Sequence, residues 1–555
     1  MMSGQVLMQR LLNRLDVERD LAGWHRTLAP MRATHRPGIE RTALFCDLMT
    51  IRTTVKFESL VAGLLRFLGY RAVVLLEGPN RLVERIFRAA VPDAEFVYRS
   101  HIDAEVQAAA EAQADAVLAS ARSLQDLVAL ELDGFRVGRN VQSFVVRQFR
   151  VGRLDDENPE HRALTRKLLA QALATKRFVE DLLATHRPDI AVFNERGYTP
   201  AGDVFDGCVL HGVDTVQWCG APQSDCLIYR RYDRKTRGEH PLALSDAMWK
   251  RLRAMPWSDQ DDRAVIARIV ANYASGAWYN RQQLQEGKAV LAPDEVRSTL
   301  GLDPARKTAV IFCHILYDAT FFYGESLFED YEQWLVETVR AAIANPAINW
   351  VVKVHPVNVW RSRMDGAELV QLEAQTLQRH FGTLPDHVKL MAADTPVNTF
   401  SLFDIADYGL TVRGTIGMEL PCFGVPVVTA GTGRYSGRGF TIEPPTREKY
   451  AALLATLQNV PRLGEEAIRL ARMHYYGALN LRPVPMCSFV LDYNVPGRFG
   501  LPPHADLIMK HVADRRLLET EDLGRLIRWM RESNAPELLS HDIDVKPRIA
   551  LSEFA

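Results

Sequence analysis

Two basic side chains precede a proline at Lys353-Val354-His355-Pro356, at the end of a short apolar run. Side chains alternate across a strand, so Lys353 and His355 are expected on one face, and Pro356 is expected to end the strand. A buried strand rarely holds two cationic groups without an anionic partner. The motif therefore predicts a site for an anion such as a nucleotide phosphate. The alternative is a strand-end lysine and a histidine satisfied within the core.

A second motif runs from Val412 to Glu419 and is typical of a strand, a turn of small residues and the start of a helix. Free amides and the dipole at a helix N-terminus favour an anion. Gly414 and Gly417 would let the backbone approach a phosphate closely, and Thr415 is expected to cap the helix. Glu419 misses the capping-box position relative to Thr415 by one residue, so it has no obvious local partner. A hydrogen bond from a ribose hydroxyl to Glu419 is therefore expected. The alternative is an ordinary turn with a surface glutamate.

A third motif is the predicted strand at 425–430 and the glycine-rich loop after it. Arg434 and Tyr435 lie in this loop, where they would reach a base or a sugar. Arg413, in the preceding turn, would stabilise a departing phosphate. A loop of this kind is equally typical of a purely structural turn.

A catalytic base is expected in the N-terminal half. Glu195 follows a predicted strand at 189–194, and a carboxylate at that edge would take the proton from an acceptor hydroxyl. Asp47, after the first strand, is the rival base. The alternative for Glu195 is an ion pair with Arg196 or another basic residue. His240 carries little weight because no strand is predicted before it.

Two further groups of residues are candidates for the same cleft. His314 with Asp318 ends the first predicted strand of the C-terminal half and would line the cleft. The loop at 49–56 would close over an acceptor, with Arg52 and Lys56 offering positive charge. A solvated loop is the alternative.

The elements that must position these residues alternate between strand and helix in both halves of the chain. Apolar runs at 42–48 and 71–76, and again at 308–314 and 349–355, are separated by helical stretches. This alternation predicts parallel sheets with helices on both faces. Ligands in such sheets bind beyond the carboxyl ends of the strands. We therefore predict an α/β fold with two Rossmann-type, doubly wound domains that face a central cleft.

The chain has 555 residues, which is too long for one hydrophobic core. Pro, Asp and Gly residues gather at 287–302, which indicates a linker. We predict a helical leader at 1–38, an acceptor domain at 39–290 with a helical insertion at about 102–186, a donor domain at 300–490, and a partly helical extension at 491–555.

Composition excludes some classes of protein and partner. Lys and Arg total 67 against 68 for Asp and Glu, so the basic excess typical of nucleic-acid binders is missing. The seven cysteines include no C-x-x-C pair, which favours free thiols in a reducing compartment. Arginine and acidic residues interrupt the first apolar stretch, so we expect no signal peptide and a cytoplasmic protein. Peripheral attachment to the inner membrane is left open.

The order of the three C-terminal motifs resembles that of the capsule polysaccharide biosynthesis proteins, which include the Kdo transferases of capsule and lipopolysaccharide assembly. The resemblance covers about residues 349–445: Lys-x-His-Pro, Thr-x-Gly-x-Glu, Gly-x-Pro-Val-Val and a Gly/Tyr loop. More distantly, it extends to polyglycerol-phosphate transferases and nucleotide-sugar 2-epimerases. In that group these elements contact the donor nucleotide, and the matching positions here are His355, Pro356, Thr415, Gly417 and Glu419.

The resemblance implies a glycosyltransferase of the GT-B kind. It would move a sugar from a CMP-Kdo-like donor, or secondly a UDP- or GDP-sugar, to a saccharide or lipid-linked acceptor of a bacterial surface polysaccharide. No cofactor is expected, since the nucleotide-sugar is a substrate. No metal is expected either, because GT-B enzymes usually need none and the chain lacks Asp-x-Asp and His-x-x-x-His motifs.

Two alternatives remain beside the transferase. One is an epimerase or glycerophosphotransferase of related fold, and the other is a non-catalytic partner in polysaccharide assembly. The chain departs from the family pattern at Arg413-Gly414 and at Leu420-Pro421, where Pro421 is expected to bend the helix.

Overall fold

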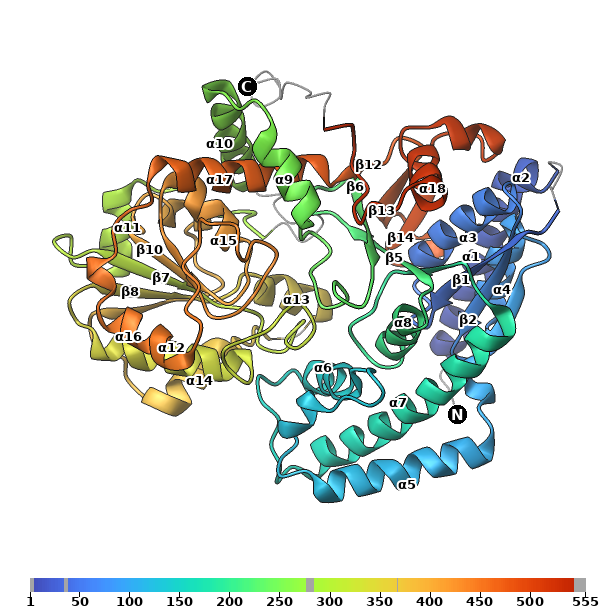
Figure 1. Ribbon diagram of the computed structural model, residues 1–555, viewed down its shortest axis with the longest axis horizontal. Helices are drawn as coiled ribbons and strands as arrows, with labels where there is room; N and C mark the ends of the chain where they lie inside the picture. The colour runs from blue at the N-terminus through green and yellow to red at the C-terminus, as the bar shows by residue number, and fades with distance from the viewer. Residues whose placement is uncertain (1–3, 34–37, 276–283, 367, 544–555) are drawn as a thin grey trace.

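A computed structural model describes the protein at residues 4–33, 38–275, 284–366 and 368–543. Figure 1 shows two lobes, of which one contains the beginning and the end of the described chain and the other contains its middle. Parts of the predicted leader (1–3 and 34–37) and of the predicted extension (544–555) lie outside the described residues.

The N-terminal lobe is built on a seven-stranded sheet with the order β12-β6-β5-β4-β1-β2-β3. Strands β1 to β5 are parallel, as predicted, whereas β6 pairs antiparallel with β5, and β12 pairs antiparallel with β6 at the edge of the sheet. The strand order reverses between β1 and β4, and a crevice is expected at such a point. The strands are β1 (Arg41–Asp47), β2 (Tyr70–Leu76), β3 (Glu95–Tyr98), β4 (Ile190–Phe193), β5 (Asp214–Gly220), β6 (Cys226–Tyr232) and β12 (Val484–Pro485).

Helices cover both faces of this sheet, which explains why its strands are apolar throughout. In β1, Ala43 and Phe45 pack with α3 and α4, whereas Leu44 and Cys46 pack with α7 and α8 on the other face. The helices are α3 (Arg52–Arg66), α4 (Arg81–Ala90), α7 (Pro159–His186) and α8 (Ala201–Leu210).

The C-terminal lobe has a five-stranded parallel sheet with the order β11-β10-β7-β8-β9. Both lobes thus repeat the doubly wound strand order, and the predicted fold class is confirmed. One face packs on α12 and α16, and the other on α10, α15 and α17. The elements are β7 (Thr308–Phe312), β8 (Asn349–Lys353), β9 (Val388–Met391), β10 (Tyr408–Thr411), β11 (Val427–Thr429), α10 (Asp259–Ala274), α12 (Tyr331–Ala344), α15 (Ile416–Glu419), α16 (Arg447–Ala455) and α17 (Glu465–Tyr476).

Two strands of this lobe end two residues before their predicted limits. β8 ends at Lys353, because Pro356 already stands at the start of α13 (Val357–Asp365) and His355 lies in the turn between them. β7 ends at Phe312, so His314 also lies in a loop at the carboxyl edge.

The chain crosses between the lobes at places that differ from the predicted boundaries. α9 (Asp246–Ala254) and α10 precede the predicted linker at 287–302, yet Trp249 and Ile269 pack in the core of the C-terminal lobe (Figure 1). The return comes before residue 490, because β12 already pairs with β6. Helical periodicity predicts an apolar face but not which lobe will bury it. We call residues 233–245, between β6 and α9, the crossover segment.

The region predicted as a helical insertion at about 102–186 forms α5 (Ala104–Ser120), α6 (Val137–Phe149) and α7. These helices reach the C-terminal lobe, where Tyr317 and Phe321 join their core. Arg139 of α6 also donates twice to Glu325, with both distances 2.9 Å. The insertion therefore forms a second bridge between the lobes.

The leader and the C-terminal extension both pack on α3. Lys56 of α3 is buried, and its ammonium lies 2.6 Å from both Asp20 and Asp506. The prediction that Lys56 offers charge to an acceptor loop is therefore wrong, since α3 already begins at Arg52. The leader forms α1 (Gly4–Thr27) and α2 (Ala29–Ala33), and the extension forms β13 (Phe489–Val495), β14 (His504–Met509) and α18 (Leu523–Glu532).

Candidate functional site

A cavity of about 320 Å³ lies at the carboxyl ends of β7, β8 and β10. Its lining includes loops from the C-terminal lobe, Tyr273 of α10 and His240 of the crossover segment. Of the predicted donor-binding residues, the lining contains Lys353, His355, Arg413, Gly414, Thr415, Glu419 and Arg434.

Lys353 is a buried cation in the lining of the cavity. Its side chain is 5% exposed, and its ammonium donates to the carbonyl of Val354 at 3.3 Å. Among the described residues, no carboxylate lies within 4.0 Å of that ammonium. Burial, with Lys288 nearby, lowers the pKa of Lys353 to about 7. A ligand with negative charge would stabilise the protonated form.

His355 follows on the same edge, and its ring has a fixed tautomer. Its Nδ1 accepts the backbone N–H of Val357 at 3.2 Å, so the neutral ring has its proton on Nε2. Burial and the nearby Lys353 lower the pKa of His355 to about 3. His355 is therefore a neutral hydrogen-bond donor at physiological pH.

Two arginines complete a group of three buried cations in the lining. Arg413 donates to the carbonyls of Gly324 and Glu325, both at 3.2 Å, and to the hydroxyl of Ser326. Arg434 is 8% exposed, and its Nε and Nη1 have no hydrogen-bond partner within the described parts of the chain. Neither guanidinium has an ion-pair partner there, so their charges add to that of Lys353.

The turn at 412–419 differs in detail from its prediction. α15 is a single turn, and the side chain of Thr415 makes no capping hydrogen bond. The amides of Gly417 and Met418 donate within the turn, to the carbonyls of Gly414 and Thr415. The predicted Thr415 cap is therefore wrong, and the amides of Gly417 and Met418 are not free to bind an anion.

Gly417 and Tyr435 support the turn from behind. A β-carbon on Gly417 would lie 2.1 Å from the hydroxyl oxygen of Tyr435, so the glycine is required by the tyrosine rather than by a phosphate. Tyr435 is fully buried and donates to the carbonyl of Gly414 at 2.9 Å. Neither Gly417 nor Tyr435 belongs to the lining of the cavity.

Glu419 does line the cavity, and it has a local partner that the sequence did not predict. The hydroxyl of Tyr273 donates to its Oε2 at 2.8 Å. Complete burial raises the pKa of Glu419 to about 7. A carboxyl group of this kind accepts or donates a proton easily near neutral pH.

His314 and Asp318 also line the cavity, at the end of β7. The Nε2 of His314 accepts the backbone N–H groups of Val412 and Arg413 at 3.2 and 3.3 Å. Asp318 accepts hydrogen bonds from the hydroxyl of Tyr198 at 3.1 Å and from Arg361 at 2.9 Å. Asp318 thus links the two lobes beside the cavity.

Glu195, the predicted base, follows β4 but is not part of the lining. It is half-buried, and its Oε1 accepts the amides of Arg196 and Gly197 at 2.8 and 3.2 Å. The Arg196 guanidinium donates instead to Gln217 at 2.8 Å, so the alternative of a Glu195–Arg196 ion pair is wrong.

Asp47, the rival base, is buried within the N-terminal lobe and is 2% exposed. Its Oδ1 accepts the amide of Thr50 at 2.8 Å, and burial raises its pKa to about 7. Glu58 is fully buried near it and accepts the indole N–H of Trp218 at 3.1 Å. Burial, followed by the charge of Asp47, raises the pKa of Glu58 well above its ordinary value. Two such neighbours are best described as a pair of carboxyl groups with linked protonation.

Four tyrosine or histidine side chains of the lining were not among the predicted site residues: His240, Tyr273, Tyr323 and Tyr331. None follows a predicted strand. His240 precedes Pro241, and that dipeptide was the one available signal. Only the path of the crossover segment brings it to the cavity.

The described ranges contain neither a metal-binding cluster nor a membrane-spanning helix. There, no three His, Cys, Asp or Glu side chains are grouped so that they could hold a metal ion. Within the same residues, no helix combines the length and apolar character needed to cross a bilayer.

Comparison with known proteins gives neither a matching family model nor a matching curated protein. The chain is similar to several solved structures. KpsC of Thermosulfurimonas dismutans, a beta Kdo 2,4 transferase, gives a TM-score of 0.33 at 15% identity, over 54% of this chain and 81% of that one. The UDP-GlcNAc 2-epimerase from Neisseria meningitidis, bound to UDP-GlcNAc, gives 0.25 at 10% identity, over 79% and 96%. Anabaena Alr3699/HepE, in complex with UDP, gives 0.24 at 13% identity, over 79% and 93%.

Kdo transferases and 2-epimerases are two of the groups that the sequence resemblance names.

Proposed function

We propose that the protein is a glycosyltransferase that takes a sugar from a nucleotide-activated donor. The observation that carries the proposal is the group of three buried cations, Lys353, Arg413 and Arg434, around one cavity. Buried charges without partners are costly, and a phosphate group would supply the missing anion. A cavity of about 320 Å³ lies within the range of small-molecule sites.

The proposed mechanism assigns the phosphate to these cations and the ribose to Glu419. Arg413 stabilises the negative charge on the departing nucleotide. Glu195 deprotonates the acceptor hydroxyl, because it is the half-buried carboxylate at the end of β4, whereas Asp47 is enclosed. A CMP-Kdo-like donor is the first expectation and a UDP- or GDP-sugar the second. The acceptor is a saccharide or lipid-linked saccharide of a bacterial surface polysaccharide, and no metal takes part.

Thermal unfolding with CMP, CDP, UDP and GDP tests the donor site. A ligand at about 100 times its dissociation constant stabilises the native state by roughly 2.7 kcal/mol. We expect one nucleotide to raise the midpoint selectively and Lys353→Met to abolish that shift. Lys449→Met, on the exposed face of α16, is the matched control. If none of the four nucleotides shifted the midpoint, the proposed donor site would be wrong.

Turnover without an acceptor separates the transferase from its alternatives. A transferase consumes the donor rapidly only when acceptor is added, whereas an epimerase converts a UDP-sugar alone. Binding without turnover under either condition would favour a non-catalytic role in polysaccharide assembly.

We further propose that the protein is cytoplasmic and associates peripherally with the inner membrane through α1. Met8, Leu11 and Leu15 are exposed, at 57%, 52% and 44%, and recur at helical spacing on one face. Arg10 and Arg14 lie in the same turns, so the exposed half of α1 combines apolar and basic side chains, as anionic lipid requires.

Vesicle flotation tests the membrane proposal. We expect the protein to float with vesicles of phosphatidylglycerol and phosphatidylethanolamine, and not with phosphatidylcholine alone. The double variant Leu11→Glu/Leu15→Glu should remain in the dense fraction, while Val290→Glu, an exposed apolar position elsewhere, should float. Equal flotation of both variants would count against α1.

A further inference from the structure

The crossover segment is held by buried arginines of the N-terminal lobe and of the returning chain. Arg196 and Arg482 are 1% and 0% exposed, and both donate to backbone carbonyls of the segment rather than to carboxylates. Arg196 donates to the carbonyls of Arg237 and Glu239, and Arg482 donates to those of Pro241 at 2.8 Å and Ala243 at 3.0 Å.

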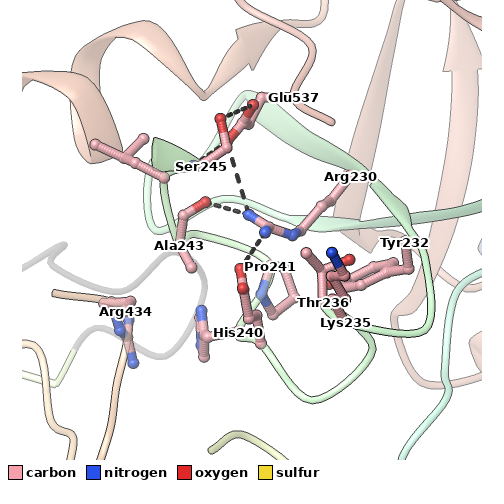
Figure 2. Close-up of polar contacts among 12 residues, drawn as sticks. Arg230, Tyr232, Lys235, Thr236, His240, Pro241, Ala243, Ser245, Arg434 and Glu537 are labelled. Atoms are coloured by element: carbon pink, nitrogen blue, oxygen red, sulfur yellow. Dashed lines mark hydrogen bonds and ion pairs between the residues drawn. The ribbon is translucent and has the colours of Figure 1, made fainter. Parts of the chain in front are cut away.

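A third arginine fixes the far end of the segment. Arg230 is fully buried and donates to the carbonyl of Ala243. The amide and the hydroxyl of Ser245 both donate to the carboxylate of Glu537 (Figure 2). The carbonyls of the residues on both sides of His240 are therefore engaged by guanidinium groups. A backbone held in this way gives the side chain of His240 a fixed position.

The ring of His240 is fixed as well. Its Nδ1 accepts the amide of Leu242 at 3.0 Å, so the neutral ring has its proton on Nε2. The ring also packs on Tyr323, with 4.7 Å between the centroids. Burial, followed by the charges of Arg434, Arg196, Arg230 and Arg482, keeps the pKa of His240 well below its ordinary value. The imidazole is thus a neutral donor and a poor base.

Arg434 supplies an independent sign of a ligand at this place. It lines the same cavity as His240, is more than nine-tenths buried, and has Nε and Nη1 without partners among the described residues. In Figure 2 both side chains lie on the same side of the crossover segment. An oxygen with negative charge would satisfy both donors at once.

We propose that the Nε2–H of His240 and the guanidinium of Arg434 together bind an anionic oxygen of the ligand, a phosphate oxygen of the nucleotide. The crossover segment then forms part of the donor site, and His240 is a binding residue rather than a base. This inference rests on the proposed function in one respect, namely that the ligand of the cavity is a nucleotide.

Calorimetric titration tests the inference with CMP, CDP, UDP, GDP and inorganic pyrophosphate as probes. His240→Phe keeps a ring against Tyr323 but removes the N–H, and we expect it to weaken binding about tenfold. His240→Gln places an amide N–H near the position of Nε2 and should bind within about threefold of the unchanged protein. His511→Phe, at an exposed position, is the matched control.

The possible outcomes separate this inference from the proposed function. If the unchanged protein binds none of the probes, both fail. If it binds a nucleotide and His240→Phe binds equally well, His240 is not a binding residue while the donor site stands. If a variant does not fold, nitrogen-15 NMR spectra of the His240 ring in the unchanged protein still test the inference. A neutral Nε2–H ring at about pH 5 to 8, shifted by the bound probe, supports the inference. A protonated or unshifted ring overturns it.

Discussion

The two lobes share one strand order but differ in how their buried charges are satisfied. In the N-terminal lobe, Arg196 and Arg230 donate hydrogen bonds to backbone carbonyls and side chains of the protein. Asp47 lies near a second carboxyl group, that of Glu58. In the C-terminal lobe, Lys353 and Arg434 keep positive charges for which the described residues supply no carboxylate partner. Buried cations that gather around one cavity therefore mark the ligand site better than the fold does.

The largest expected effect concerns the base, because it tests whether the N-terminal lobe contributes chemistry at all. Glu195→Gln should lower kcat by about 10²- to 10⁴-fold, the usual contribution of a general base. Nucleotide affinity should stay unchanged, since Glu195 lies outside the cavity lining. Initial rates at saturating donor and acceptor give kcat, and calorimetry gives the affinity. Glu180→Gln, on α7, is the control. An unchanged kcat would remove Glu195 from the mechanism.

A smaller effect, with opposite signs for binding and stability, is expected at Lys353. Lys353→Met should weaken nucleotide binding about tenfold or more but stabilise the free protein by about 1–3 kcal/mol, because it removes a buried charge without a partner.

The pH dependence at Lys353 has a defined sign. The folded pKa is about 7, below that of the unfolded lysine, so the unfolded state binds the extra proton above that pH. The unchanged protein should therefore gain stability relative to Lys353→Met as the pH rises from about 7 towards about 10. Urea unfolding at a series of pH values measures this difference. A difference that does not vary with pH would contradict the buried, deprotonating lysine.

The smallest effect is expected at Asp47. Its folded pKa is raised to about 7, so the folded state keeps a proton that the unfolded state loses. That contribution to stability is complete below about pH 4 and is lost as the pH rises through about 7. Asp47→Asn should therefore gain stability relative to the unchanged protein as the pH rises from about 4 through about 7, and should be equal or less stable near pH 4. Its kcat should stay within about threefold. A larger loss of activity would make Asp47 the base.

The sequence predicted the alternation of elements, and most of its donor-site candidates line the cavity, because both depend on local pattern. Lys353 and His355 lie at a strand edge that the apolar run and Pro356 define without further information. The role of Gly417 could not be predicted in the same way. A glycine in a turn is equally compatible with a ligand or with a side chain behind it, and here that side chain is Tyr435.

His240 and Tyr273 could not be predicted for a different reason. Both belong to a stretch that precedes the linker predicted from composition, yet both line the cavity of the C-terminal lobe. Periodicity shows that α10 has an apolar face, but a choice between two apolar surfaces depends on their three-dimensional complementarity. Local sequence pattern therefore predicts site residues at strand ends more reliably than site residues in segments where the chain crosses between the lobes.

The return of the chain to the N-terminal lobe at β12 has a consequence for synthesis on the ribosome. The C-terminal lobe is a contiguous stretch inserted within the N-terminal lobe, whereas the N-terminal lobe is completed by β12, β13 and α18, which follow that stretch in the chain. Until β13 and α18 emerge, Phe57 and Leu60 of α3 lack neighbours such as Phe489 and Trp529. The apolar face of α3 is thus exposed to chaperones or to aggregation in the nascent chain, while the lobe with the cavity can fold before β13 and α18 are made.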